Sequence, residues 1–263
     1  GETGIALYTY DALANSVEER VFIESSRSFA ALEAELGELA YVNNDQQFYL
    51  YLDGNIIRID LNTMEYETIV SGIEEESCMV SSDGRFAAWH QENSLYASSA
   101  VTILDLETGT SRSVSAQDGY YIQALGFMGT DFIYGEARQS DVQQDIAGNI
   151  TFPMGRVVIQ DKDGNELRSS DYESRGKYVV SISIEDNRIS LSCVQRAADG
   201  SYEEAAQEAI TSGAVETVEK ISLETKDSGV KKREYYFALS DGRGTGTLRR
   251  LTPEQVLFEG SRS

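Results

Sequence analysis

Short apolar segments of strand length alternate with turn signals along this chain, most clearly over residues 81–110. There, "RFAAWH" (residues 85–90) follows Asp83-Gly84, a dipeptide typical of tight turns between strands. A second segment, "AVTILDLET" (residues 100–108), is rich in β-branched residues and ends in a Thr-Gly turn signal. The pattern predicts two strands, each bounded by a turn.

The second of these segments recurs. Residues 54–70 ("GNIIRIDLNTMEYETIV") repeat it when Asp60 is aligned with Asp105. Weaker copies surround Asp11 and Asp161, so that the four aspartates are separated by 49, 45 and 56 residues. A period of about 50 residues built from strands and turns is typical of propeller blades, with about four strands in each.

A further self-match indicates the number of blades. Residues 21–28 ("VFIESSRS") and 256–263 ("VLFEGSRS") are identical at five of eight positions and lie 235 residues apart, which is five periods of 47. Each blade buries its faces against its neighbours, and ring closure removes the exposed ends. We therefore expect an all-β protein: a single β-propeller domain over residues 1–263, with about five four-stranded blades.

Three segments depart from the strand pattern. "SFAALEAELGEL" (residues 28–39) combines strong helix formers with a capping serine, which predicts a short helix between blades. Residues 201–211 ("SYEEAAQEAIT") have helical propensity but follow Asp-Gly, so helix and strand are equally favoured. The stretch from Glu136 to Met154 is polar and weakly periodic, which predicts a long excursion between strands.

Composition narrows the classes of partner. The chain is 41% hydrophobic and 25% charged, as in folded globular proteins. Its net charge of -22 repels phosphate backbones and anionic lipid, which argues against nucleic-acid and membrane-surface partners. Its apolar runs are far shorter than the ~20 residues that span a bilayer. The opening "GETG" has the character of a cut edge, so we expect a fragment of a longer chain.

Residue types needed for catalysis or metal binding are scarce. His90 is the one histidine, which excludes His-rich zinc sites, and we expect a solvent-facing or hydrogen-bonded structural role for it. The sequence contains no Gly-x-Ser-x-Gly elbow, P-loop or dinucleotide-binding fingerprint. Cys78 and Cys193 are expected to be buried thiols, with a bridge between them left open. We therefore expect no catalytic, cofactor-binding or metal-binding residues and no cofactor.

The remaining motifs favour structural roles. "DKDGNE" (residues 161–166) alternates calcium-type ligands, but its glycine comes too early for an EF-hand, so a hairpin turn is favoured. "GRGTGT" (residues 242–247) predicts a flexible hairpin loop. Ser81, Asp83 and Trp89 approach the Ser-x-Asp-x-Gly-x-x-Trp box of sialidase propellers, but a glycine directly follows the aspartate, so the spacing is wrong.

From residue 81 to residue 110 the chain resembles TolB-like and WD-repeat-like β-propellers, which repeat Ser-Pro-Asp-Gly, an apolar strand, and a strand ending in Asp-Leu-x-Thr-Gly. Ser82 replaces the proline, and residues 40–115 carry the clear resemblance. "ALGFMGTDFIYGEA" and "ITFPM" resemble the propeller region of extracytoplasmic proteins of Gram-positive gut bacteria, where the propeller belongs to a longer, membrane-anchored chain. The resemblance implies an extracytoplasmic location, with the protein held at the cell surface by a segment missing from this chain.

A ring with none of the usual catalytic constellations favours a non-catalytic module for binding or scaffolding. Its partners would be an unknown protein, peptide or glycan ligand and the missing domains of the same chain. Ligands would bind where the loops of the blades converge, and residues 136–154 are the candidate contact surface. Two alternatives stay open: a carbohydrate-active hydrolase with two carboxylates about 5–9 Å apart in the central funnel, and a purely structural spacer.

Overall fold

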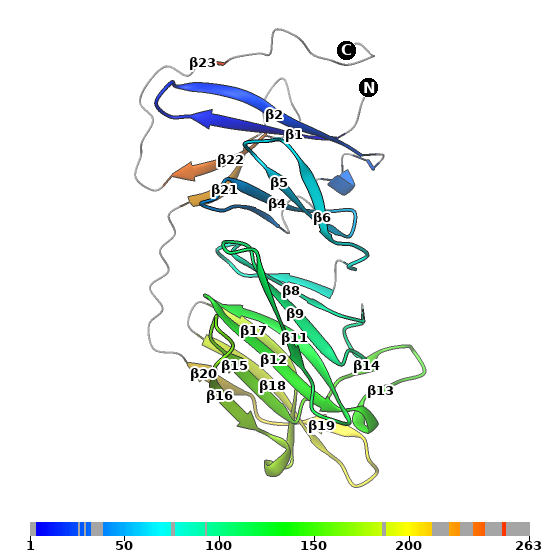
Figure 1. Cartoon of the computed structure of the whole chain (residues 1–263). Helices are drawn as coiled ribbons and strands as arrows, with labels where there is room; N and C mark the ends of the chain where they lie inside the picture. Colours follow the sequence, from blue (N-terminus) through cyan, green and yellow to red (C-terminus); the bar gives the residue numbers. More distant parts are fainter. Residues whose placement is uncertain are drawn as a thin grey trace. The chain divides into compact units, whose positions relative to one another are not determined.

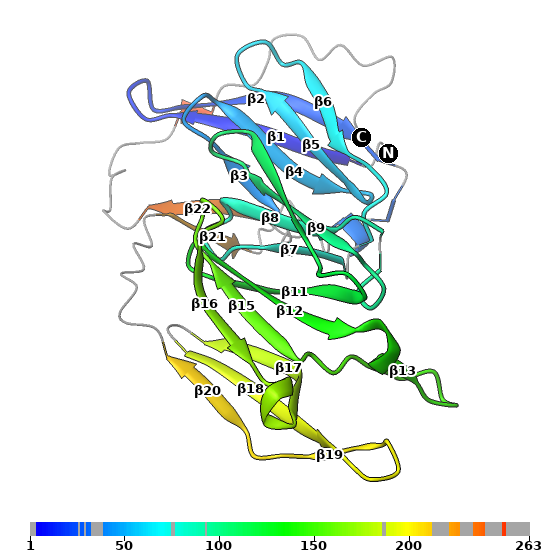
Figure 2. The same cartoon turned by 60° about the horizontal axis from the view of Figure 1, so that its bottom comes forward.

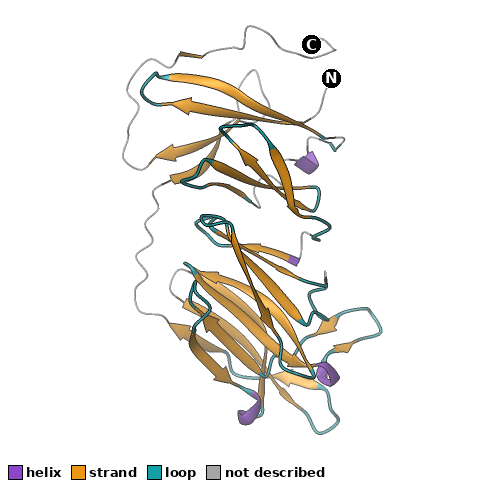
Figure 3. Cartoon of the chain, viewed as in Figure 1, coloured by secondary structure: helices purple, strands orange, loops and turns teal. Residues whose placement is uncertain are grey.

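The computed structural model describes residues 4–25, 27–28, 30–32, 39–74, 77–92, 94–185, 188–211, 221–226, 234–239 and 249–250. Strands dominate these residues, which confirms the all-β class (Figure 3). They divide into two compact units: the described strands before residue 35 and after residue 215 form one, and the described residues from 39 to 211 form the other.

The smaller unit consists of two antiparallel strand pairs and one short parallel strand (Figure 1). Its pairs are β1 (Gly4–Asp11) with β2 (Ser16–Glu24) and β21 (Ile221–Lys226) with β22 (Glu234–Leu239), while β23 (Arg249–Arg250) runs parallel to β2. The second copy of the self-match, residues 256–263, and the "GRGTGT" loop lie outside the described residues.

The larger unit contains four antiparallel sheets that follow one another in chain order (Figure 2). Sheet I consists of β3 (Ala40–Val42), β4 (Gln47–Leu52), β5 (Asn55–Asp60) and β6 (Tyr66–Val70). Sheet II consists of β7 (Cys78–Val80), β8 (Phe86–His90), β9 (Ala100–Asp105) and β10 (Thr110–Ser115). Sheet III consists of β11 (Tyr120–Met128), β12 (Asp131–Arg138), β15 (Arg156–Gln160) and β16 (Glu166–Asp171).

In sheet IV, two short strands share one long neighbour. Its strands are β17 (Lys177–Glu185), β18 (Arg188–Arg196), β19 (Tyr202–Glu204) and β20 (Glu208–Thr211), and both β19 and β20 pair with β18. The strand alternative for residues 201–211 is therefore correct, and the helical one is wrong. Pairing with an already formed strand outweighs the modest helical preference of a few alanines and glutamates.

Each pair of successive sheets encloses its own apolar core. Alternate residues of β8 face opposite ways: Ala87 and Trp89 pack toward sheet I, and Phe86 and Ala88 pack toward sheet III. A third core fills the space between sheets III and IV, with Ile133 among its buried members. Sheets that bury both faces against neighbours are the arrangement that the repeat predicts for propeller blades.

The repeated aspartate has a structural cause. Asp60 and Asp105 end the third strands of sheets I and II, and Asp161 directly follows the third strand of sheet III. Each carboxylate accepts hydrogen bonds from backbone N–H groups of the following turn, as Asp11 does between β1 and β2. A carboxylate that satisfies turn N–H groups holds the chain reversal, so the repeat marks an equivalent hairpin in sheets I, II and III. The "DKDGNE" segment is such a hairpin turn, as predicted.

The segment from residue 81 to residue 110 is held together by two local devices. Ser81 Oγ donates to Asp83 Oδ1 at 2.6 Å, and Gly84 has a φ of 72°, a conformation that favours glycine. The Arg85 guanidinium then donates twice to Asp105, at 3.0 and 2.8 Å. The first turn of sheet II is thereby tied to the end of its third strand, which explains why the two motifs occur together.

Two smaller expectations concern residues 28–39 and the two cysteines. Residues 30–32 form a helical turn, and the N–H of Ala31 donates to Ser28 Oγ at 3.3 Å. Residues 29 and 33–38 lie outside the described residues, so the helix over residues 28–39 stays a prediction. Cys78 and Cys193 form no disulfide; Cys193 is buried as expected, while Cys78 is only partly buried.

Candidate functional site

The predicted excursion between residues 136 and 154 is a hairpin that projects from sheet III (Figure 2). After β12 the chain forms the short 3-10 helix η2 (Gln139–Asp141) and the strands β13 (Gln143–Gln144) and β14 (Ile150–Thr151). It returns through the buried Phe152 and Met154. Met154 exchanges two backbone hydrogen bonds with Val179 of β17, at 2.8 and 2.9 Å. The base of the hairpin is therefore fixed to rigid sheets.

The tip of this hairpin is stiff and carries exposed aliphatic side chains. Asp145 Oδ1 accepts hydrogen bonds from the N–H groups of Ala147 and Asn149, at 2.8 and 2.9 Å. Asp145 Oδ2 accepts a third bond from Asn149 Nδ2 at 2.8 Å. Ile146 is fully exposed and Ile150 is 38% exposed. Since these side chains contribute nothing to a core, they are available for contact with another molecule.

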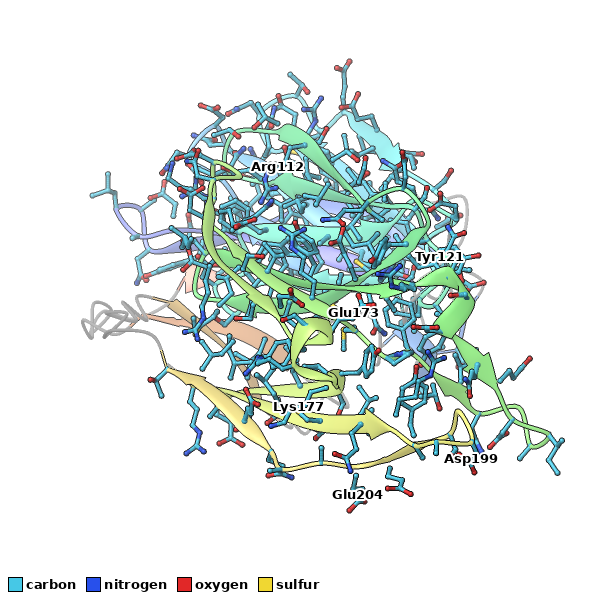
Figure 4. All side chains as sticks on the ribbon, turned by 90° about the horizontal axis from the view of Figure 1, so that it is seen from below. Arg112, Tyr121, Glu173, Lys177, Asp199 and Glu204 are labelled. Atoms are coloured by element: carbon cyan, nitrogen blue, oxygen red, sulfur yellow. The ribbon has the colours of Figure 1, made fainter. Side chains whose placement is uncertain are left out.

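Seven polar and aromatic residues gather near the base of the hairpin, where sheets III and IV meet. We call this set the Arg–Tyr cluster. It draws on β11, β12, η2, the 3-10 helix η3 (Glu173–Arg175), β17, β18 and β19, and Figure 4 labels Glu173 within it. Its members are Tyr120, Arg138, Asp141, Glu173, Tyr178, Arg196 and Tyr202.

Two ion pairs organise the cluster. Arg138 Nε donates to Glu173 Oε1 at 2.6 Å, and Arg196 Nη2 donates to Asp141 Oδ1 at 3.1 Å. The Asp141 side chain is 8% exposed, whereas the Arg138 and Arg196 side chains are 50% and 42% exposed. The Glu173 side chain is 30% exposed, so in each pair the acid is less exposed than its arginine.

The arginines also stack on tyrosine rings. Arg138 Cζ lies 5.2 Å from the centre of the Tyr120 ring, and Arg196 Cζ lies 5.7 Å from that of Tyr202. Tyr178 meets Tyr202 edge to face, with ring centres 5.5 Å apart. Burial raises the pKa of Tyr178, Glu173 and Asp141 raise it further, and both arginines oppose the rise. The two ion pairs thus share one neighbour and form a single cluster.

The cluster contains more hydrogen-bond donors than it uses. The Tyr202 hydroxyl is buried and has no hydrogen-bond partner among the described residues. Burial, and then the nearby Asp141, raise the pKa of Tyr202 to about 12, so the hydroxyl keeps its proton at neutral pH. Within the described part of the chain, both terminal nitrogens of Arg138 and the Nε and Nη1 atoms of Arg196 donate to no protein acceptor.

Other polar residues singled out from the sequence serve the fold. His90 is buried, donates from Nδ1 to the Ser77 carbonyl at 3.3 Å, and accepts at Nε2, which confirms a hydrogen-bonded structural role. Glu136, where the predicted contact segment begins, is buried and accepts hydrogen bonds from Gln117 N–H and an Arg156 nitrogen, at 3.0 and 2.9 Å. Trp89 packs in the core between sheets I and II.

The described residues show neither a metal-binding cluster nor a membrane-spanning helix. No group of three or more His, Cys, Asp or Glu residues there is placed to hold a metal ion. None of the helices in that part of the chain has the length and apolar character needed to cross a bilayer.

Comparison with known proteins finds similar solved structures. No protein-family model and no curated protein matches the chain. The chain is similar to TolB from Acinetobacter baumannii, with 18% identity and a TM-score of 0.28 over 80% of this chain and 49% of that one. TolB gives its name to the family that the sequence resembles.

Two further similar structures are a bacterial lyase and AztD. Oligogalacturonate lyase from Vibrio parahaemolyticus has 12% identity and a TM-score of 0.33, over 64% of this chain and 52% of that one. AztD from Citrobacter koseri has 15% identity and a TM-score of 0.31, over 65% and 43%. The chain spans about half the length of these proteins or less. The fold assignment itself rests on the four sheets and the three cores between them.

Proposed function

We propose that this chain is a non-catalytic β-propeller module that binds a protein or peptide through the β13–β14 hairpin and the Arg–Tyr cluster near its base. The observation that carries the proposal is Ile146, a fully exposed aliphatic side chain on a tip that Asp145 holds rigid. A preorganised apolar anchor loses little conformational entropy on binding, and it fits an apolar pocket on a partner.

The finer architecture belongs to the same proposal. We infer that the repeat continues to about five blades over residues 1–263, with a short helix at residues 28–39. The basis is the aspartate period and the self-match between residues 21–28 and 256–263. We further propose an extracytoplasmic location, with anchoring and additional domains supplied by segments outside this chain. The sequence resemblance to membrane-anchored propeller proteins supports this location.

A binding role is favoured over hydrolysis by the way the acids of the cluster are engaged. A glycosidase needs a carboxyl group that is free to give its proton to the glycosidic oxygen. Asp141 and Glu173 each accept a hydrogen bond from an arginine, so both carboxylates are already engaged within the protein. Incubating the chain with a panel of oligosaccharides is expected to release no reducing ends.

A peptide-display selection tests the binding proposal. Peptides enriched on the wild-type chain are expected to lose most of their affinity for Ile146→Ser. Leu167→Ser is the matched control, because Leu167 is 57% exposed on β16 of the same sheet and lies outside the hairpin. Enriched peptides that bind Ile146→Ser as tightly as the wild type, or release of reducing ends from any oligosaccharide, would contradict the proposal.

A further inference from the structure

We infer that the Arg–Tyr cluster recognises a carboxylate group of the bound peptide, either an acidic side chain or a free carboxyl terminus. This inference deepens the proposed function and rests on it. It begins from the unused donors: the buried Tyr202 hydroxyl and the outward nitrogens of Arg138 and Arg196. Buried polar groups without a partner are rare in native proteins, and such a hydroxyl on a ring that Arg196 stacks against points to an acceptor supplied from outside.

A carboxylate matches this set of donors. Guanidinium groups present planar pairs of N–H donors that fit two carboxylate oxygens, and the neutral Tyr202 hydroxyl adds a third donor. The ion pairs to Glu173 and Asp141, together with stacking on tyrosines, restrict how the guanidinium groups turn. The donors are therefore oriented before the ligand arrives, which lowers the entropic cost of binding.

The charge of the chain limits the ligand to few acidic groups. A net charge of -22 repels a densely acidic polymer over long distances. The two arginines of the cluster are balanced by Asp141 and Glu173, so the attraction is local and directional. A peptide with one or two carboxylates among apolar residues meets both conditions, because its apolar side chains also suit Ile146.

The covered faces of the tyrosines disfavour an acidic glycan. Sugar rings are commonly bound against an open aromatic face. Here Arg138 covers a face of Tyr120, Arg196 covers a face of Tyr202, and Tyr178 meets Tyr202 from another direction. Tyr178 is itself 9% exposed. The cluster thus offers donors, and little open ring surface, to a ligand.

The test uses two sets of fluorescein-labelled octapeptides rich in leucine. One set carries Asp, Glu or a free carboxyl terminus, and the other carries Asn, Gln or an amidated terminus at the same positions. The carboxylate set is expected to bind the wild-type chain at least about tenfold more tightly, as is typical of charge-assisted hydrogen bonds. Oligogalacturonate serves as the acidic glycan probe and is expected not to compete.

Three variants separate ligand recognition from folding. Arg138→Gln and Arg196→Gln are each expected to weaken the carboxylate peptides about tenfold. Tyr202→Phe is expected to weaken them several-fold while leaving the melting temperature unchanged or higher, since it deletes a hydroxyl that lacks a partner within the described protein. Arg168→Gln is the matched control, because this residue lies on β16, outside the cluster, where its Nε donates to Ser170 Oγ at 3.4 Å.

Each contrary outcome has a distinct meaning. If both peptide sets bind equally and binding still depends on Ile146, the carboxylate inference fails and the proposed function stands. If Tyr202→Phe and Arg138→Gln bind like Arg168→Gln, the inference also fails. If oligogalacturonate alone binds, the ligand is an acidic glycan and both proposals are overturned. If neither peptide set binds, the inference is wrong, and the display selection then decides the proposed function by itself.

Discussion

The Nε2 atom of His90 accepts a hydrogen bond from the backbone N–H of Ala124 at 3.0 Å, which joins β8 of sheet II to β11 of sheet III. Because Nε2 is the acceptor, the imidazole proton lies on Nδ1, which faces the Ser77 carbonyl. A second ring proton, on Nε2, would face the N–H of Ala124, so that two donors would meet without an acceptor. The only histidine of the chain is thus a neutral link between two sheets.

Stability is expected to fall when the protein is acidified below about pH 6.5. Burial lowers the pKa of His90, although the Ser77 carbonyl and Glu92 oppose the change. Above pH 6.5 the ring is neutral in both folded and unfolded chains, so it adds no pH dependence. Below pH 6.5, the unfolded chain binds a proton at His90 that the folded chain does not bind. The free energy of unfolding therefore falls by up to about 1.4 kcal/mol per pH unit until the pH reaches the folded pKa.

Urea unfolding of wild type and His90→Gln between pH 7.5 and pH 5 measures this effect. Glutamine does not titrate, so the variant is expected to lose less stability over the interval, whatever its stability at pH 7.5. Parallel stability curves for the two proteins would show that His90 is not responsible.

The repeat allows a matched comparison of two aspartates at equivalent positions. Asp105→Asn is expected to destabilise the protein by about 1–3 kcal/mol, because Asp105 receives two bonds from Arg85 and its side chain is 17% exposed. Asp60→Asn is the control. Asp60 is the aligned residue of sheet I, and its Oδ1 atom accepts hydrogen bonds from the N–H groups of Asn62 and Thr63, which the side-chain oxygen of asparagine also satisfies. Chemical denaturation of both variants at pH 7 gives the difference, and equal losses would contradict a special role for Arg85.

The stability difference between Asp105→Asn and the wild type is also expected to depend on pH. Burial raises the pKa of Asp105, but the hydrogen bonds and charge of Arg85 outweigh burial and leave the pKa lowered. A lowered carboxyl pKa stabilises the folded chain above about pH 4 and loses that contribution as pH falls through the folded value. The free energies of unfolding of Asp105→Asn and of the wild type are therefore expected to approach each other below pH 4.

These comparisons also show what the sequence could and could not predict. The strands within residues 54–70, 85–90 and 100–108 followed from turn signals and from short apolar or β-branched segments, since Asp83-Gly84 and the repeated aspartate act within a few residues of chain. For residues 201–211 the local signals were balanced, and pairing with β18 decided in favour of strands. Local physics was sufficient where the determining contacts are local.

The Arg–Tyr cluster could not be predicted from the sequence, because the contacts that bring its members together are not local. Its members extend from Tyr120 to Tyr202 and have no common spacing, because each comes from a different strand or short helix. The only usable signal was the length and polarity of residues 136–154, which located the hairpin. Each arginine stacks on its cross-strand neighbour within one sheet, Arg138 on Tyr120 and Arg196 on Tyr202. Whether these two pairs come together depends on how sheets III and IV pack, and a single sequence carries no direct record of that.

Gly135 of β12 is expected to tolerate no side chain. A Cβ atom built there would lie 2.1 Å from Met154 Sδ, so alanine would force the buried Met154 side chain out of its position. Gly135→Ala is expected to cost about 1–3 kcal/mol, as overpacking of a core does. Thermal unfolding measures the loss. In a double-mutant cycle, Met154→Ala should cost less in the Gly135→Ala background than in wild type, and additive losses would exclude the clash as the cause.

Shortening the hairpin is expected to remove binding without unfolding the protein. Replacing residues 144–150 by Asn-Gly deletes the tip of the hairpin. The first strand pair, Gln143 with Thr151, and the anchoring residues that follow it are kept. The hydrogen bonds of the Asp145 turn lie within the deleted segment, so the melting temperature should change by only a few degrees.

Asp145→Ala separates rigidity from contact. It keeps Ile146 but removes the three bonds that fix the tip, so the peptides selected on the wild type are expected to bind a few-fold more weakly, at the entropic cost of ordering a loose loop. Ile146→Ser should weaken them further, because the apolar contact itself is lost. Fluorescence anisotropy with one selected peptide ranks the variants. If Asp145→Ala binds as the wild type does, the stiffness of the tip plays no part in recognition and the exposed side chain acts alone.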